Sequence, residues 1–161
     1  MTHPDLAYVE LASTHAFPVN EAIKIGGQYV PVLRDGKLLY VSGQIPRIGD
    51  QVHFVGVVGS GPDAAIDLGS ARRAAAICTL RALALAKAAL GSLADIRSVP
   101  RISVFVRSAP DFTQQSEVAD GASEALYAVF GSRGVHTRTS VGVLQLPKGA
   151  AVEIDFVFGV E

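Results

Sequence analysis

The chain of 161 residues contains a single cysteine, Cys78. One thiol cannot form an intramolecular disulfide and cannot supply a metal site built from several thiolates. Cys78 lies among alanines and leucines in a helical pattern, and a cysteine becomes a nucleophile only where its surroundings lower its pKa. We therefore expect a buried packing thiol.

Charged residues are also scarce, at 18% of the chain against 49% hydrophobic residues. The 14 basic and 15 acidic residues are mixed along the sequence, with a formal net charge of -1. No basic field is present to attract nucleic acid or an anionic membrane surface, so neither partner is expected. The surplus of apolar residues indicates that some surface is buried in an oligomer.

No apolar run is long enough and free enough of charge to cross a membrane. The most apolar region, residues 74–90, is dominated by alanine and contains Arg81 and Lys87. The first residues, MTHPDLAYVELAS, lack the basic start and apolar middle of a secretory signal. We expect a cytoplasmic protein.

Several familiar catalytic motifs are absent as well. The segment GVVGSG at residues 56–61 lacks the Gly-Lys-Ser/Thr of a P-loop and is read as a turn. The four histidines show no metal-ligand spacing, so no metal is expected. Ser42 is not part of a Gly-x-Ser-x-Gly elbow. A P-loop, a zinc centre and a hydrolase triad are therefore not predicted.

The patterns that are present predict an α+β domain with the order β-β-β-α-β-α-β-β and both helices on one face of the sheet. An Arg-Asp-Gly turn predicts a hairpin, the run from Gln51 predicts a third strand, and a strand follows around Ile102. Helices are expected at Asp67–Leu90 and Asp111–Phe130, with a short one at Pro4–Ala12. Residues 136–156 read as a closing hairpin around Pro-Lys-Gly.

Two charged residues interrupt the strands of that closing hairpin. The guanidinium of Arg138 presents a fork of donors that matches a small carboxylate, and Glu153 could orient water or exchange a proton. The alternative is a salt bridge between the two. A hairpin turning at Pro-Lys-Gly places Arg138 opposite Gly159, about 20 Å from Glu153. The two residues therefore serve separate places, or a second subunit brings them together.

The stretch YVSGQIP forms another polar group at a strand end. Gly43 allows a ligand to approach the backbone, and Ser42 offers a hydroxyl beside it. A simple bulge explains the same glycine equally well.

These residues also carry a resemblance to a known family. The motifs SGQIP at residues 42–46, PDF at 110–112, Arg-x-Ser-Val-x-Val at 138–143 and LPKGAAVEID at 146–155 together resemble the YjgF/Rid (endoribonuclease L-PSP-like) family of reactive intermediate deaminases. The likeness covers about residues 27–158. It divides the chain into an amino-terminal extension, 1–26, and a YjgF/Rid-like domain, 27–161.

The resemblance implies a chorismate-mutase-like fold assembled as a homotrimeric barrel, with a ligand cleft between subunits and no cofactor. It implies hydrolysis of enamine or imine intermediates such as 2-aminoacrylate to 2-keto acids and ammonia. By the same resemblance Arg138 holds the substrate carboxylate and Glu153 positions the attacking water. The pocket-lining positions that it implies are Tyr29, Ser42, Gly43, Ser116 and Ser140.

Two other functions remain open from the sequence. A binding module could use the same cleft to hold a keto acid or another small carboxylate without turnover. Ribonuclease activity is often ascribed to this family, but the neutral charge balance and the lack of paired histidines argue against it here.

Overall fold

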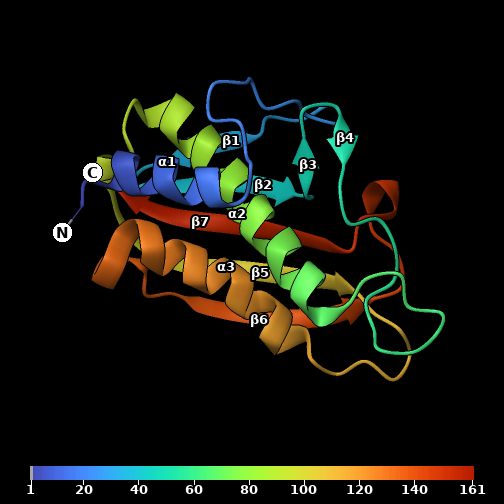
Figure 1. Cartoon of the computed structure of the whole chain (residues 1–161). Coiled ribbons are helices and arrows are strands. Elements are labelled where there is room, and N and C mark those ends of the chain that lie inside the picture. Colours follow the sequence, from blue (N-terminus) through green and yellow to red (C-terminus); the bar gives the residue numbers. More distant parts are fainter. Residues whose placement is uncertain (1) are drawn as a thin grey trace.

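In the computed structural model, which describes residues 2–161, a five-stranded sheet carries all the α-helices on one face (Figure 1). Its strand order is β1-β2-β7-β5-β6, and a separate pair, β3-β4, lies beside it. The strands are β1 (Val32–Asp35), β2 (Leu38–Gln44), β3 (Arg47–Ile48), β4 (Gln51–Val52), β5 (Ile96–Arg107), β6 (Thr137–Val143) and β7 (Val152–Val160). The helices are α1 (Pro4–Thr14), α2 (Leu68–Leu90) and α3 (Gln115–Phe130), with 3-10 turns η1 (Leu93–Asp95), η2 (Gly131–Gly134) and η3 (Pro147–Gly149). The predicted α+β class is therefore confirmed.

Helix α2 begins and ends where the sequence predicts. The side chain of Asp67 accepts a hydrogen bond from the backbone N–H of Ser70, and Gly91 ends the helix with a φ of 90°. The alanine-rich face is buried from Ala71 to Ala86, and Cys78 is fully buried within it. Burial raises the pKa of the Cys78 thiol, as expected for a packing residue.

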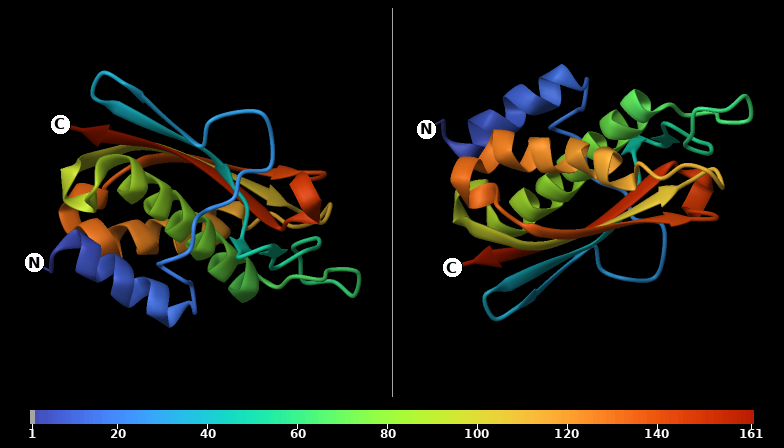
Figure 2. Two further views of the ribbon diagram at one scale, coloured as in Figure 1. Left: turned by 90° about the horizontal axis from the view of Figure 1, so that it is seen from above. Right: turned by 90° about the horizontal axis from the view of Figure 1, so that it is seen from below.

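Helix α3 packs beside α2 on the sheet (Figure 2). It starts at Gln115, four residues later than predicted, because Asp111 lies in a turn that precedes the helix. Its inward-facing apolar residues are all buried: Val118, Ala122, Ala125, Leu126, Val129 and Phe130. A Cβ atom added at Gly121 would lie 2.2 Å from the backbone oxygen of Arg72, so the two helices approach as closely as their backbones allow.

The amino-terminal helix α1 covers the outer side of α2 and α3 (Figure 2). It contributes Tyr8 and Ala12 to the same core that the sheet and the other helices form, and Phe17 follows them. Burial raises the pKa of Tyr8 to about 12. The short helix expected at Pro4–Ala12 is confirmed and extends to Thr14.

Two strand predictions are wrong. The run from Gln51 contributes only Gln51 and Val52 to a strand, and the chain then passes through isolated bridges rather than joining the main sheet. The closing segment is not a hairpin, because β5 lies between its two strands, parallel to β6 and antiparallel to β7. The alternation of apolar and polar residues predicted where strands occur, but it contained no information on which strands pair with each other.

Candidate functional site

Strand β2 ends in a bulge at the start of the SGQIP motif. Its register with β7 shifts between Val41 and Gln44, so one extra residue is accommodated at Ser42 and Gly43. A cavity of about 640 Å³ opens at this point. Residues of five stretches of the chain line it: Lys24, Ile25, Gly26, Tyr29, Ser42, Gly43, Gln44, Ile45, Arg47, Arg81, Pro147, Lys148, Glu153 and Asp155. The bulge interpretation of Gly43 is confirmed, and the bulge forms one wall of the cavity.

The carboxyl group of Glu153 lies directly over Gly43. A Cβ atom built on Gly43 would be 2.3 Å from Oε1 of Glu153, so a glycine leaves the room that this carboxyl group occupies. Glu153 alternates along β7 with buried residues and therefore points away from the helices. Burial raises the pKa of Glu153, and the nearby carboxylate of Asp155 raises it further. This acid group is thus suited to exchange a proton at milder pH than an ordinary glutamate.

Two further predicted residues line the same cavity. The hydroxyl of Ser42 donates to the backbone oxygen of Val30 at 3.0 Å, which ties the strand end to the segment that carries Tyr29. Tyr29 is half exposed. The fold therefore brings Tyr29, Ser42, Gly43 and Glu153 together from three separate parts of the chain.

The other three predicted residues lie at the far edge of the sheet, beside α3. Arg138 donates from Nη2 to the backbone oxygen of Ser116 at 3.1 Å and to its hydroxyl at 3.0 Å, and from Nη1 to the hydroxyl of Ser123 at 2.7 Å. Nη2 also lies 2.8 Å from Oδ1 of Asp120. Ser140 is two residues further along β6 and therefore faces the same side as Arg138.

These two clusters face opposite sides of the sheet. Arg138 pairs with Ile102, whereas Glu153 pairs with Phe105, and β5 separates their strands. Two strand spacings and three residues of offset correspond to roughly 14 Å between the backbones. The hairpin geometry that gave about 20 Å was wrong, since the strands are not neighbours. Within one chain, Arg138 is paired with Asp120 rather than Glu153.

The sequence did not predict two arginines of the cavity wall, Arg81 and Arg47. Arg81 interrupts the alanine-rich helix α2 and is only 4% exposed. Its guanidinium donates to Oε1 of Gln44 at 3.1 Å and to the backbone oxygen of Arg47 at 2.9 Å. The available signal was a charged residue in the middle of an apolar helical stripe, which is rarely buried without a partner.

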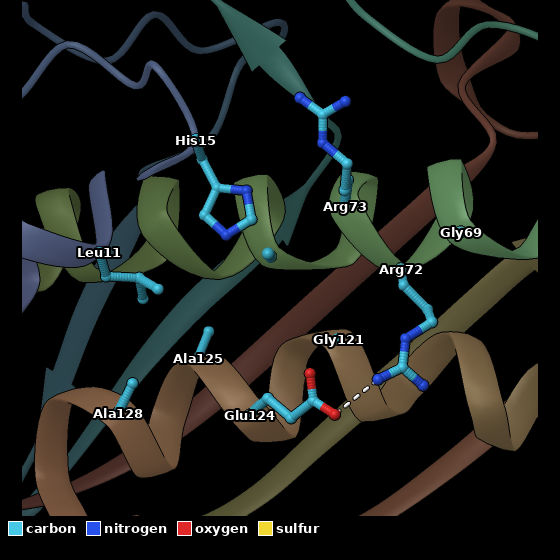
Figure 3. A pocket seen from close by; sticks show the side chains of 10 residues that line it. Leu11, His15, Gly69, Arg72, Arg73, Gly121, Glu124, Ala125 and Ala128 are labelled. Atoms are coloured by element: carbon cyan, nitrogen blue, oxygen red, sulfur yellow. Dashed lines mark hydrogen bonds and ion pairs between the residues drawn. The ribbon is translucent and has the colours of Figure 1, made fainter. Parts of the chain in front are cut away.

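A second, smaller hollow lies on the helical face of the molecule (Figure 3). It has a volume of about 350 Å³ and is lined by residues of all three helices, including Arg72 and Glu124, whose side chains pair with each other. His15 borders it, and burial lowers the pKa of this histidine. The hollow contains none of the predicted site residues.

No helix within residues 2–161 has the length and apolar character needed to cross a membrane. This agrees with the expectation from the charges at Arg81 and Lys87.

Comparison with known proteins identifies the family of this chain. A family model described as "Endoribonuclease L-PSP" matches residues 19–159. The chain therefore belongs to the endoribonuclease L-PSP family, the YjgF/Rid family that its motifs resemble.

Individual relatives agree with this assignment. Protein TCP17 of Trypanosoma cruzi is 42% identical over 128 residues, which are 79% of this chain and 78% of that protein. The crystal structure of Atu1372 from Agrobacterium tumefaciens, a protein of unknown function, is 37% identical with a TM-score of 0.83 and covers 98% of this chain and 94% of that one. A candidate endoribonuclease from Shewanella oneidensis shares 22% identity and the same fold, with a TM-score of 0.86 over 99% of this chain and 100% of that one.

Proposed function

We propose that the protein is a hydrolytic deaminase of reactive enamine or imine intermediates of the 2-aminoacrylate type, which it converts to 2-keto acids and ammonia. The observation that carries the proposal is the carboxyl group of Glu153, held over Gly43 inside a cavity and with a raised pKa. A cavity of this volume is in the range that holds a small molecule.

The chemistry needs one water and one proton carrier. Glu153 as carboxylate accepts a proton from water while the water oxygen attacks the carbon of the protonated imine, which forms a neutral carbinolamine. The same carboxyl group then returns this proton to nitrogen, which makes an ammonium leaving group. As the carbon–nitrogen bond breaks, the carboxylate accepts the hydroxyl proton, so that the carbonyl forms and ammonia leaves. The imine is already electrophilic, so holding the substrate and water in line is the main contribution required of the protein. Ser42 and Tyr29 border the space in which the substrate would lie.

The proposed site is completed by a second copy of the chain. Arg138 with Ser116 and Ser140 cannot reach Glu153 within one subunit, because they lie at the far edge of the sheet and on its other face. The face of the sheet that is not covered by helices also exposes Tyr40, Leu33 and other apolar side chains. Contact between copies would cover these side chains and could bring the Arg138 of one copy to the cavity of the next. We propose a homotrimer with Arg138 binding the substrate carboxylate.

The test uses 2-aminoacrylate generated in place by a threonine dehydratase acting on serine. The parent protein should accelerate release of keto acid and ammonia, and Arg138→Ala should slow it at least about tenfold through loss of a charge-assisted hydrogen bond. Arg97→Ala is a matched control, since Arg97 is exposed and pairs with Glu161. Light scattering should show a trimer. A monomer, or an Arg138→Ala variant as fast as the parent, would refute the proposed site.

A second candidate is a binding module that holds a keto acid in the same cleft without turnover. The specific observation in its favour is that the cavity wall contains two arginines, Arg47 and Arg81, since holding an acid group requires a guanidinium but no proton carrier. Calorimetric binding of a keto acid, together with no acceleration of imine hydrolysis, would favour this function.

A further inference from the structure

The cavity beside Glu153 has a buried guanidinium in its wall that is bound only by neutral acceptors. Arg81 donates from Nε to Gln44, from Nη1 to the backbone oxygen of Arg47 and from Nη2 to the backbone oxygen of Lys24 at 3.2 Å. These three bonds use three of its five N–H groups. Because the side chain is only 4% exposed, little water is available to compensate its charge.

A second guanidinium lines the same wall. The Nε of Arg47 is buried without a hydrogen-bond partner, and its backbone is held by Arg81. Across residues 2–161, neither arginine forms a salt bridge with a carboxylate. The positive charge of Arg47 contributes to a lowered pKa at Arg81, after the larger effect of burial. Two like charges are thus held near each other. Asp50, whose pKa is lowered mainly by its pairing with Lys24 and to a smaller extent by Arg47, is already hydrogen-bonded to Lys24.

The charge balance of the whole cavity also favours an anionic ligand group. Its lining includes the basic residues Lys24, Arg47, Arg81 and Lys148, but only the acids Glu153 and Asp155. Lys24 is neutralised by Asp50, which is not among the lining residues. Of the two acids, Glu153 has a pKa that is raised by burial and by Asp155, so it compensates the remaining cations less well than an ordinary glutamate. An anionic ligand group would relieve this imbalance.

We propose that Arg47, positioned by Arg81, binds a second acid group of the substrate, so that the site favours imino and keto acids with a carboxylate at each end. This inference rests on the proposed function, in which Arg138 of another copy holds the first carboxylate. The reacting carbon would then lie between the two acid groups and beside Glu153. Both ends of the ligand would be fixed by guanidiniums, which match carboxylates with paired hydrogen bonds.

Two keto acids of equal length test the idea. 2-Oxopentanoate and 2-oxopentanedioate differ only in a terminal methyl group against a carboxylate. By calorimetry, the parent protein should bind the diacid at least about tenfold more tightly, since one charge-assisted hydrogen bond is worth that much. In Arg47→Gln the ratio of the two Kd values should fall toward one. Arg97→Gln removes an exposed charge away from the cavity and should keep the parent ratio.

Arg81 provides an independent check on the arrangement. Arg81→Lys keeps the positive charge, but a lysine cannot donate to Gln44, Arg47 and Lys24 at the same time. The preference for the diacid should therefore decrease, and circular dichroism should show that the variant is folded. Equal affinity of the parent for both acids, or an unchanged ratio in Arg47→Gln, would overturn the second-acid-group inference and leave the proposed function standing. Failure to bind either acid, with no imine hydrolysis, would instead refute the proposed function.

Discussion

Arg138 and Asp120 form an ion pair, with Nη2 of the arginine 2.8 Å from Oδ1 of the aspartate. The arginine is on β6 and the aspartate on α3, and two serines of the same helix bind the same guanidinium. A substrate carboxylate at Arg138 would therefore compete with Asp120 or bind beside it.

Asp120→Asn should strengthen binding of a monocarboxylic keto acid by several-fold, because it removes the competing negative charge while keeping a side chain of the same shape. Calorimetry with 2-oxobutanoate measures this. Glu124→Gln is the matched control, since Glu124 pairs with Arg72 instead. Unchanged or weaker binding in Asp120→Asn would contradict a carboxylate site at Arg138.

Glu153→Gln should lower the rate of imine hydrolysis by about 100-fold or more, the typical contribution of a general acid or base. At neutral pH it should also raise the melting temperature slightly, because burial and Asp155 disfavour the charged form of Glu153. Because the pKa of Glu153 is higher in the folded protein than in the unfolded chain, where it is about 4.3, the free energy of unfolding falls as pH rises from the unfolded pKa through the folded pKa. A loss of both activity and stability would indicate a structural role instead.

Asp155→Asn should move the acid limb of the pH–rate profile to lower pH. The carboxylate of Asp155 raises the pKa of Glu153, so its removal makes Glu153 easier to ionise. The profile of kcat/KM between pH 4 and 8 reports this midpoint. Asp63→Asn serves as a control on an exposed acid that does not line the cavity. No shift in Asp155→Asn would show that the two carboxyl groups do not interact.

Gly43→Ala should reduce activity strongly, because the new methyl group would occupy the position of the Glu153 carboxyl group. Glu153 is a flexible side chain that can move aside, so the fold should survive with a loss of about 1 kcal/mol or less. Chemical unfolding and the imine assay measure the two effects separately. Gly26→Ala, at a cavity-lining glycine with open space around its Cα, is the control.

Gly121→Ala should destabilise the protein by about 2–3 kcal/mol, since the added methyl group meets the backbone of Arg72 and forces α2 and α3 apart. Gly69→Ala lies in the first turn of α2 with only ordinary contacts, and the higher helix propensity of alanine should leave its stability equal or higher. Urea unfolding compares the two variants. Equal stabilities would show that the helices can separate at little cost.

Local patterns predicted much of the fold because local physics determines those parts. Asp67 and Gly91 set the ends of α2 through a capping side chain and a positive φ, and both are visible in the sequence. The alternation around Ile102, Val104 and Val106 likewise identified β5 and its buried face. The prediction of a full strand from Gln51 was wrong, because β-branched residues favour an extended chain without requiring that the chain join a sheet.

The sequence by itself determined the helices, the principal strands and the family motifs. Only the tertiary structure decided that β5 lies between β6 and β7, that Arg138 faces Asp120, and that Arg81 reaches Gln44 and Arg47. Capping and periodicity depend on residues a few positions apart. Strand pairing and buried charge partners depend on contacts between distant segments, which no local pattern specifies.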